Sequence, residues 1–335
     1  MSPAPPIYLD HQSTTPVDPR VVEAMAPWWT HDFGNAASRT HVFGWRAEAA
    51  VEAARETLAR AIGAADAREI VFTSGATESD NLALQGVARA ARARGRDHLV
   101  TVATEHPAVL DTVRALATEG FAVTELPVDG AGLVDPGDVA RAIGERTALV
   151  SVMWANNEIG VLQPIEAIGA VCRERRVPLH RDAAQAVGKV PVDVSSARVD
   201  LLSFPAHKLY GPKGVGALRV RSGRPRLRLA PMLHGGGHEG GLRSGTLPVP
   251  LIVGFARAVE LALAERDAEA AHLVGLRERL LARLREGLGD VVVHGDLERR
   301  VPGNLNVEFR GLEADALICE VLWVDRYGTL QLNAD

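Results

Sequence analysis

Residues 69–81 read EIVFTSGATESDN, and this stretch decides the fold class. Its first five residues, EIVFT, form an apolar and β-branched run of the kind found in a buried strand. Small residues then permit a tight turn, and the segment that follows, 76–94, has the apolar spacing of a helix. A strand that passes through a glycine turn into a helix is the unit from which parallel α/β sheets are built.

The same alternation of strand and helix patterns extends from about residue 46 to residue 221. We expect helices at 46–62, 76–94, 106–119, 135–144 and 164–176. We expect strands at 69–73, 98–103, 121–128, 147–155, 177–183, 199–206 and 214–221. Such strands need both faces covered, so the sequence predicts a large α/β domain with a mostly parallel sheet.

The amino-acid composition of the chain changes after Pro250. Residues 251–288 are rich in Ala, Leu, Arg and Glu and are compatible with one long helix or two in series. The runs DVVVHGD and NLNVEF follow, and then a short helix beginning near Ala314. We therefore expect a large domain over 16–250 and a smaller α+β domain formed by 1–15 and 251–335.

Composition limits the classes of function. The 335 residues include 37 Lys and Arg against 42 Asp and Glu, which gives a net charge of −5. This mild acidity argues against direct nucleic-acid binding through a broad basic field. No stretch reaches the roughly 18 uninterrupted apolar residues of a membrane span, and the first residues lack a secretion signal. We expect a cytoplasmic protein with no membrane contact.

The chain has two cysteines, Cys172 and Cys319. They are too few for a disulfide framework and lack the spacing of metal ligands. Both lie in helical patterns rich in Ala, Leu and Ile. We expect two buried structural thiols and no metal site.

Polar residues at the predicted strand ends mark the candidate site, because ligands of open α/β sheets bind beyond the carboxyl ends of the strands. The N–H groups of Gly75, Ala76 and Thr77 begin a helix and can hold an anion such as a phosphate. Ser74 or Thr77 could instead serve only as a helix cap. Residues 73–81 alone do not decide between these interpretations.

Two further strand ends carry His106 and the pair Asp182 and Gln185. A carboxylate beside a heteroaromatic nitrogen would keep that nitrogen protonated, because an opposite charge favours the charged form. The alternatives are structural: His106 could be a helix-start histidine, and Asp182 could satisfy helix amides.

Lys208 follows the apolar run of the next strand. Partial desolvation would lower its pKa and free the amine for attack on a carbonyl. Lys213 competes for this role on composition, but it lies in a Gly-Pro turn where a solvated side chain is favoured. A phosphate cradle, a ring-facing histidine, an acid and a lysine together describe a pyridoxal phosphate site.

Seven stretches of the chain resemble the cysteine desulfurases of the NifS and IscS type. These are fold-type I pyridoxal phosphate enzymes of the class V aminotransferase group. The resemblance covers about residues 7–322 and is carried by residues 8–21, 33–55, 69–83, 104–112, 156–165, 207–218 and 234–246. It implies the fold-type I transferase fold, with a large domain and a smaller one.

The resemblance also implies roles for single residues around the cofactor ring. Lys208 would form the Schiff base with pyridoxal 5'-phosphate. His106 would stack on the ring and act as an acid or base. Asp182 would pair with the ring nitrogen, and Gln185, with Asn157 beside it, would contact the ring hydroxyl.

The phosphate contacts are implied in the same way. Ala76, Thr77 and His207 would hold the phosphate from within one chain. Thr246 would reach the phosphate from the partner subunit, so the resemblance implies a homodimer.

The implied reaction converts L-cysteine to L-alanine and passes the sulfur to an enzyme cysteine as a persulfide. A sulfur-acceptor or scaffold protein would then be a partner. Whether the sulfur serves iron–sulfur cluster assembly or tRNA thiolation is left open by the sequence.

The end of the chain departs from the family. The persulfide cysteine normally lies on a loop like SSGSAC, followed by a segment with an arginine for the substrate carboxylate. This sequence reads ICEVLWVDRYGTLQLNAD over 318–335 instead. Cys319 falls within a predicted helix and does not replace the nucleophile. We expect a truncated or frame-shifted copy whose small domain is incomplete.

Two smaller departures concern Pro205 and Arg181. Pro205 stands where the family often has a serine that contacts the phosphate. Arg181 stands where an apolar residue is usual, and we expect its side chain to point to the opposite face from that of Asp182, away from the cofactor.

Two other functions remain open at this point. One keeps the cofactor but changes the reaction to a lyase or aminotransferase that needs no persulfide cysteine. The other is a catalytically silent protein that dimerises with a complete desulfurase or binds a scaffold.

Overall fold

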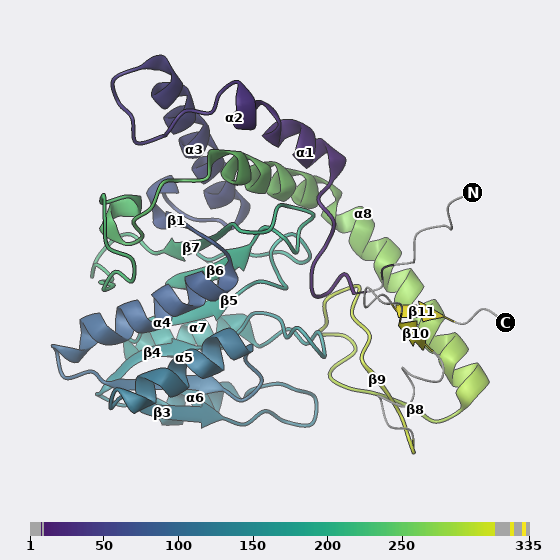
Figure 1. The fold of residues 1–335 in the computed structure, drawn as a ribbon. Helices are drawn as coiled ribbons and strands as arrows, with labels where there is room; N and C mark the ends of the chain where they lie inside the picture. Colours follow the sequence, from purple (N-terminus) through teal and green to yellow (C-terminus); the bar gives the residue numbers. More distant parts are fainter. Residues whose placement is uncertain (1–7, 9, 312–321, 325–329, 333–335) are drawn as a thin grey trace, which may run out of the picture.

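The computed structural model describes residues 8, 10–311, 322–324 and 330–332. Its centre is a seven-stranded sheet with the order β1-β7-β6-β5-β4-β2-β3 (Figure 1). The strands are β1 (Ile70–Thr73), β2 (His98–Val102), β3 (Ala122–Leu126), β4 (Thr147–Ser151), β5 (Leu179–Asp182), β6 (Leu201–Pro205) and β7 (Gly216–Val220). Every strand expected between residues 69 and 221 is present.

The sheet is parallel except at β7, which runs antiparallel to both β6 and β1. Pairs β2–β3, β2–β4, β4–β5 and β5–β6 are parallel. The segment between β6 and β7 contains no helix. A parallel crossover needs about a dozen residues or more, usually with a helix, so this short connection leads to an antiparallel strand. The prediction of a mostly parallel sheet is therefore confirmed.

Within the described residues, eight α-helices connect and cover these strands. They are α1 (Pro19–Met25), α2 (Pro27–Thr30), α3 (Val42–Ala61), α4 (Ala76–Arg92), α5 (Pro107–Thr118), α6 (Pro136–Ala142), α7 (Ile165–Arg175) and α8 (Val249–Leu288), with short 3₁₀ turns at Ala67–Glu69 and Glu239–Gly241. α3 begins earlier than expected because the side chain of His41 caps it by accepting a hydrogen bond from the Gly44 N–H. α1 and α2 have no counterpart in the sequence prediction.

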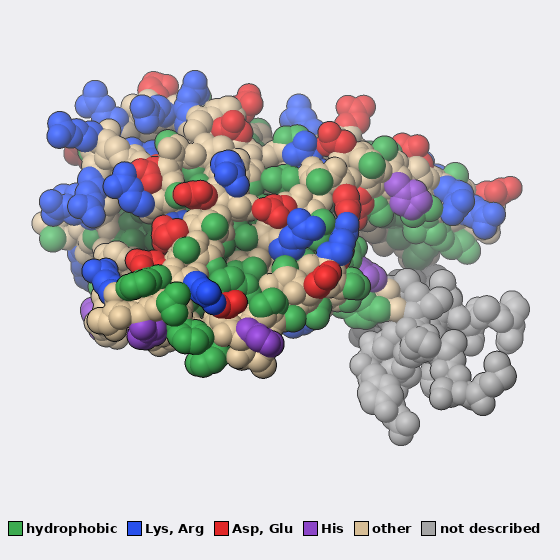
Figure 2. All heavy atoms as spheres, turned by 90° about the horizontal axis from the view of Figure 1, so that it is seen from above, with side chains coloured by type: hydrophobic (Ala, Val, Ile, Leu, Met, Phe, Trp, Pro, Cys, Tyr) green, Lys and Arg blue, Asp and Glu red, His purple; other side chains and the backbone are tan. Residues whose placement is uncertain are grey.

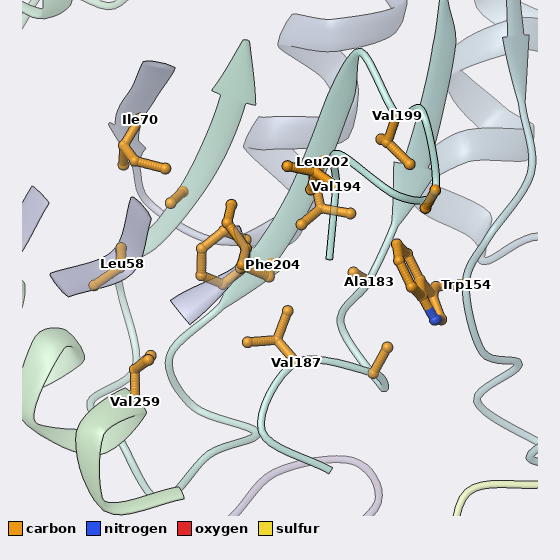
Figure 3. Packing of buried hydrophobic residues seen from close by; sticks show 14 of the residues in the cluster. Leu58, Ile70, Trp154, Ala183, Val187, Val194, Val199, Leu202, Phe204 and Val259 are labelled. Carbon is orange, nitrogen blue, oxygen red and sulfur yellow. The ribbon is translucent and has the colours of Figure 1, made fainter. Parts of the chain in front are cut away.

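Apolar clusters cover both faces of the sheet. Leu202 and Phe204 of β6 face the cluster that Leu58 of α3 and Val259 of α8 complete (Figure 3). Leu201, which precedes Leu202 on β6, points to the other face and joins the cluster formed with α4 and α5. Burying one such side chain contributes about 1.5–3 kcal/mol, so the two clusters hold the strand ends in place.

Residues 251–288 form one helix, α8, so the open choice between one helix and two is resolved. After it come β8 (Val291–Val293) and β9 (Val307–Phe309), which pair antiparallel, as do β10 (Leu322–Val324) and β11 (Leu330–Leu332). The helix expected near Ala314 and the predicted structural thiol Cys319 lie outside the described residues. Within the described part of the chain, no helix is apolar over enough length to span a membrane.

Candidate active site

A cavity of about 880 Å³ lies beyond the carboxyl ends of the parallel strands. This volume is in the range of small-molecule sites. The predicted site residues that line it are Ala76, Thr77, His106, Asn157, Asp182, Gln185, His207 and Lys208. Thr246 does not line it and is exposed. The strand ends thus bring together all the predicted residues except the one that the resemblance assigns to a partner subunit.

The start of α4 forms the anion-binding end of the cavity. Its N-cap, Gly75, makes no side-chain cap, so the N–H groups of Ala76, Thr77 and Glu78 keep no intrahelical partner. Gly75 has a φ of 157°, which favours glycine. Gly216 of β7 lets this turn approach closely, because a Cβ on Gly216 would lie only 2.6 Å from the Cα of Gly75. These groups can hold an anion, and the cap alternative for Ser74 and Thr77 is wrong.

A partly buried ion pair balances the charge of the acid in this first turn. The Glu78 carboxylate accepts a hydrogen bond from the Ser74 N–H at 2.7 Å and pairs with Arg243 at 2.8 Å. Burial raises the pKa of Glu78, but the Arg243 guanidinium and the Ser74 N–H lower it by more. Glu78 is therefore charged, and Arg243 limits its repulsion of a bound phosphate.

His106 is both a helix cap and a cavity residue. Its Nδ1 accepts a hydrogen bond from the Ala108 N–H at 3.1 Å at the start of α5. Since Nδ1 is an acceptor, the proton of the neutral ring is on Nε2. The structural role fixes the ring orientation, and the same ring lines the cavity.

Asp182 ends β5 and is almost fully buried. One carboxylate oxygen accepts a hydrogen bond from the Ala184 N–H at 2.8 Å. Burial, together with the charge of the Asp80 carboxyl group, raises the pKa of Asp182 to about 7. A cationic group placed beside Asp182 would restore its ionised form.

Lys208 follows β6 and is partly buried, whereas Lys213 is exposed. Burial lowers the pKa of Lys208, although the carboxyl groups of Asp182, Asp10 and Asp80 offset part of the effect. A lowered pKa increases the fraction of neutral, nucleophilic amine. This geometry favours Lys208 over Lys213 as the reactive lysine.

Residues 10–18, the N-terminal arm, hold the loop that carries Lys208. The Thr15 hydroxyl donates to the carbonyl of His207 at 2.9 Å and accepts from the Tyr210 N–H at 2.8 Å. The Thr14 hydroxyl lies 3.0 Å from Nδ1 of His207. The arm thereby fixes the backbone on both sides of Lys208.

The amide of Gln185 is held at both ends. Its Nε2 donates to the carbonyl of Gln12 at 3.0 Å, and its Oε1 accepts from the ammonium of Lys189 at 2.5 Å. A carbonyl only accepts and an ammonium only donates, so the two contacts fix which end of the amide faces the arm. Asn157 lines the cavity from the loop after β4.

The structure places both departures from the family, Arg181 and Pro205, at the ends of neighbouring strands. Arg181 donates to the carbonyls of Val152 at 3.0 Å and Ile165 at 3.1 Å, and it does not line the cavity. The expectation that Arg181 points away from Asp182 is confirmed. Pro205 lines the cavity and brings no hydroxyl donor.

Cys172 is a buried structural thiol, as expected. Its side chain is 1% exposed, and burial raises its pKa to about 12. At pH 8 roughly one molecule in ten thousand would carry the thiolate. Among the described residues, no group of three or more His, Cys, Asp or Glu is placed to hold a metal ion.

The thiol of Cys172 should therefore resist modification in the folded protein. We expect iodoacetamide at pH 8 to label Cys172 at least a hundredfold more slowly in native protein than in urea, because reaction needs the exposed thiolate. Mass spectrometry of tryptic peptides measures the two rates. Equal labelling of Cys172 in both conditions would contradict its burial.

Sequence reasoning missed several cavity residues. Asp10, Gln12 and Thr14 come from the N-terminal arm, and Asn304 comes from the loop before β9. These segments reach the site only through long-range folding. Asp80 could have been found from the sequence, because an acidic residue on the buried face of a predicted helix is unusual.

The chain is similar to a known protein family over most of its length. The Aminotransferase class-V family model matches residues 7–322. The cysteine desulfurase IscS of Anaeromyxobacter dehalogenans is 57% identical over 316 residues, which cover 94% of this chain and 78% of the relative. IscS of Neisseria meningitidis serogroup C is 56% identical, with 94% and 77% covered.

Solved structures show the same likeness. A NifS-like protein matches with a TM-score of 0.88 and 40% identity over 93% of this chain and 84% of its own. The crystal structure of DndA from Streptomyces lividans matches with a TM-score of 0.83 and 42% identity, covering 93% of this chain and 87% of its own.

Proposed function

Because the chain belongs to the class V aminotransferase family, we propose that it binds pyridoxal 5'-phosphate through Lys208 and acts on L-cysteine as a cysteine desulfurase. The observation that carries this proposal is the convergence of Lys208, Asp182, His106 and the α4 N-terminus on one cavity. Each group was singled out separately in the sequence, and together they match the parts of one cofactor.

The donor set fits pyridoxal phosphate part by part. The free N–H groups at the start of α4 suit the phosphate, and the ammonium of Lys213 adds positive charge to the lining of the cavity. The ring of His207 lines the same cavity and offers a nitrogen for a hydrogen bond. The buried carboxyl group of Asp182 needs a cationic partner, which a protonated ring nitrogen would be. Gln185 and Asn157 offer amides to the ring oxygen, and Lys208 offers an amine to the aldehyde.

When bound, pyridoxal phosphate supplies an electron-accepting ring that stabilises negative charge at the substrate Cα. Lys208, whose pKa is lowered by burial, can take the Cα proton and return it. The carboxylate of Asp182 would keep the ring nitrogen of the cofactor protonated. His106, with its proton on Nε2 and its ring fixed by the α5 cap, can donate a hydrogen bond or a proton to the substrate.

Transfer of sulfur needs a further group, a thiolate that attacks the substrate sulfur. Cys172 does not fit this role, because it is buried with a raised pKa and does not line the cavity. The proposed reaction therefore has two steps with different requirements. Proton removal at Cα depends on residues of the described cavity, and sulfur transfer requires a thiol acceptor from elsewhere.

The two steps can be tested separately in the full chain loaded with pyridoxal phosphate. We expect the Cα hydrogen of L-cysteine to exchange with solvent deuterium, and mass spectrometry of the recovered cysteine measures this exchange. We also expect alanine to form when a thiol acceptor is added. Exchange without alanine would support the cofactor chemistry and oppose desulfuration. Absence of both, with cofactor bound, would favour a catalytically silent protein.

We also propose a homodimer, supported by four exposed aromatic side chains in and between α2 and α3, those of Trp29, Phe33, Phe43 and Trp45. Trp29 is 59% exposed and Phe33 is 66% exposed, and the rings of Phe33 and Phe43 stack at 5.5 Å. Figure 2 looks onto the side where α1–α3 lie and has hydrophobic side chains gathered on it. Clustered exposed aromatics are typical of protein interfaces.

The dimer gives a role to Thr246, which is exposed and outside its own chain's cavity. If Thr246 acts across the interface, Thr246→Ala should weaken pyridoxal phosphate binding about tenfold to a hundredfold, the usual loss of a hydrogen bond to a charged group. Co-expression with Lys208→Ala should restore one tight site per dimer, because Lys208 and Thr246 then come from different chains. Fluorescence titration of purified heterodimers measures this recovery. No recovery would mean that Thr246 acts within its own chain or not at all.

A further inference from the structure

Lys189 is a partly buried lysine that lies behind the active-site cavity. It lines a second cavity of about 640 Å³ and does not line the first. Gln12 and Lys208 line both cavities, so the two cavities lie side by side. Lys189 therefore acts on a ligand in the first cavity through a neighbouring residue rather than by contact.

The neighbour that Lys189 contacts is Gln185. The chain turns in a helical manner after β5, since the Val187 N–H donates to the carbonyl of Ala183 and the Lys189 N–H to that of Ala186. Side chains four residues apart lie next to each other in such a turn. Nζ of Lys189 donates to Oε1 of Gln185 at 2.5 Å, and this is its one side-chain hydrogen bond among the described residues.

The amine of Lys189 is charged at neutral pH. Burial and the nearby charge of Lys208 lower its pKa to about 8, although the carboxyl group of Glu269 on α8 opposes this shift. Most molecules therefore carry the ammonium at pH 7. Within the part of the chain that the structure describes, Lys189 forms no ion pair, so the amide oxygen of Gln185 is the polar group that its charge contacts.

The two partners of Gln185 leave its amide one orientation. The ammonium of Lys189 only donates, and the carbonyl of Gln12, 3.0 Å from Nε2, only accepts. Exchanging the ends of the amide would place donor against donor and acceptor against acceptor. Gln185 is 2% exposed, so water does not relieve this mismatch. An amide nitrogen has two N–H groups; Gln12 takes one, and the other is left for a ligand in the cavity that Gln185 lines.

We propose that Lys189 is a positioning residue, which holds the Gln185 amide so that the cavity offers a ligand oxygen an N–H donor and not a carbonyl acceptor. A donor at this point favours an anionic oxygen, because a hydrogen bond to a charged group stabilises the charged form. The ring oxygen of pyridoxal phosphate, deprotonated to a phenolate, is such a group. This identification rests on the proposed function. Without Lys189 the amide can turn and present either end, so the selection is lost.

The first test compares pyridoxal 5'-phosphate with the analogue that lacks its ring hydroxyl. Both compounds carry the aldehyde and the phosphate, so the preference for the first over the second, measured as a ratio of dissociation constants, isolates the contact at the ring oxygen. In the full chain we expect Lys189→Met to reduce this preference about tenfold, the usual effect of a hydrogen bond to a charged group. Lys189→Gln serves if the Met variant does not fold, because its neutral amide can turn as well. An unchanged preference would overturn the proposal.

Lys213→Ala is the matched control for this comparison. Lys213 lines the same cavity but is exposed, and its expected contact is with the phosphate, which both compounds carry. We expect weaker binding of both compounds and an unchanged preference. A loss of preference as large as that in Lys189→Met would show that removing any positive charge near the cavity has this effect, and it would contradict the positioning role.

The second test uses the cofactor-free full chain. We expect the fall in melting temperature in the double variant Lys189→Met, Gln185→Leu to be smaller than the sum of the falls in the two single variants. Each single change leaves one polar partner unpaired, and the double change removes both. Additive falls would contradict the contact. If the natural sequence binds neither compound, the proposed function fails, while this cycle still decides whether Lys189 holds Gln185.

Discussion

Replacement of Lys208 by alanine is expected to abolish covalent binding of pyridoxal phosphate and to lower exchange of the cysteine Cα hydrogen by roughly 10²–10⁴-fold. Two roles are lost at once, since the same amine binds the aldehyde and moves the Cα proton. The cavity itself should remain, because the loop carrying Lys208 is fixed by backbone contacts of His207 and Tyr210 with Thr15. The visible absorbance of the bound cofactor and the exchange rate are the measurements.

Lys213→Ala is the matched control for this experiment. Lys213 lines the same cavity but is exposed in a turn. We expect its variant to weaken phosphate binding modestly and to keep the covalent linkage. Loss of the linkage in Lys213→Ala, with its retention in Lys208→Ala, would reverse the two assignments.

Replacement of Glu239 by alanine is expected to lower the free energy of unfolding by about 3–5 kcal/mol, the usual effect of breaking a buried ion pair. Both oxygens of Glu239 bind the Arg55 guanidinium, at 2.8 and 2.9 Å, and one also accepts from the Phe72 N–H at 2.7 Å. The side chains of Glu239 and Arg55 are 2% and 9% exposed. The variant would leave the buried Arg55 guanidinium with only the exposed Glu52 carboxylate and the Ile70 carbonyl as partners, and it would remove the acceptor of the Phe72 N–H.

Urea denaturation of Glu239→Ala measures this loss. Glu52→Ala is the control, because Glu52 also pairs with Arg55 but is largely exposed, and we expect it to cost less than about 1 kcal/mol. The double variant Arg55→Met, Glu239→Leu should recover part of the stability, since it removes both charges. Equal losses in Glu239→Ala and Glu52→Ala would show that burial of this pair contributes little.

The same ion pair links stability to the site. Glu239 belongs to residues 234–246, the loop that also carries Arg243 and Thr246. Arg243 pairs with Glu78 at the start of α4, so one buried and one partly buried ion pair dock this loop beside the anion-binding end of the cavity. We expect Glu239→Ala to weaken cofactor binding as well as folding.

Local sequence patterns predicted the sheet well, for a physical reason. Strands such as β4 and β6 are buried on both faces, so they are continuous apolar runs between breakers. The direction of β7 was not accessible from its own residues. It depends on the short connection after β6, which has no room for a crossover helix.

The candidate site was predictable where chemistry follows directly on a strand, as at His106, Asp182 and Lys208. It was not predictable where distant segments complete it. The N-terminal arm brings Gln12 and Thr14 to the cavity through contacts across more than 170 residues, and its polar sequence has no periodicity. Asp80 was overlooked because its neighbours in space come from β5 and the loop after β6.

The most direct test of the account is the identity of the lysine that binds the cofactor. The lysines of the chain are Lys189, Lys208 and Lys213, and all of them line this cavity or the one beside it. Sodium borohydride would make a lysine–pyridoxal linkage permanent, and peptide mass spectrometry would locate it. We expect the pyridoxyl group on Lys208 alone. A label on Lys189 or Lys213, or none on protein saturated with pyridoxal phosphate, would contradict the account.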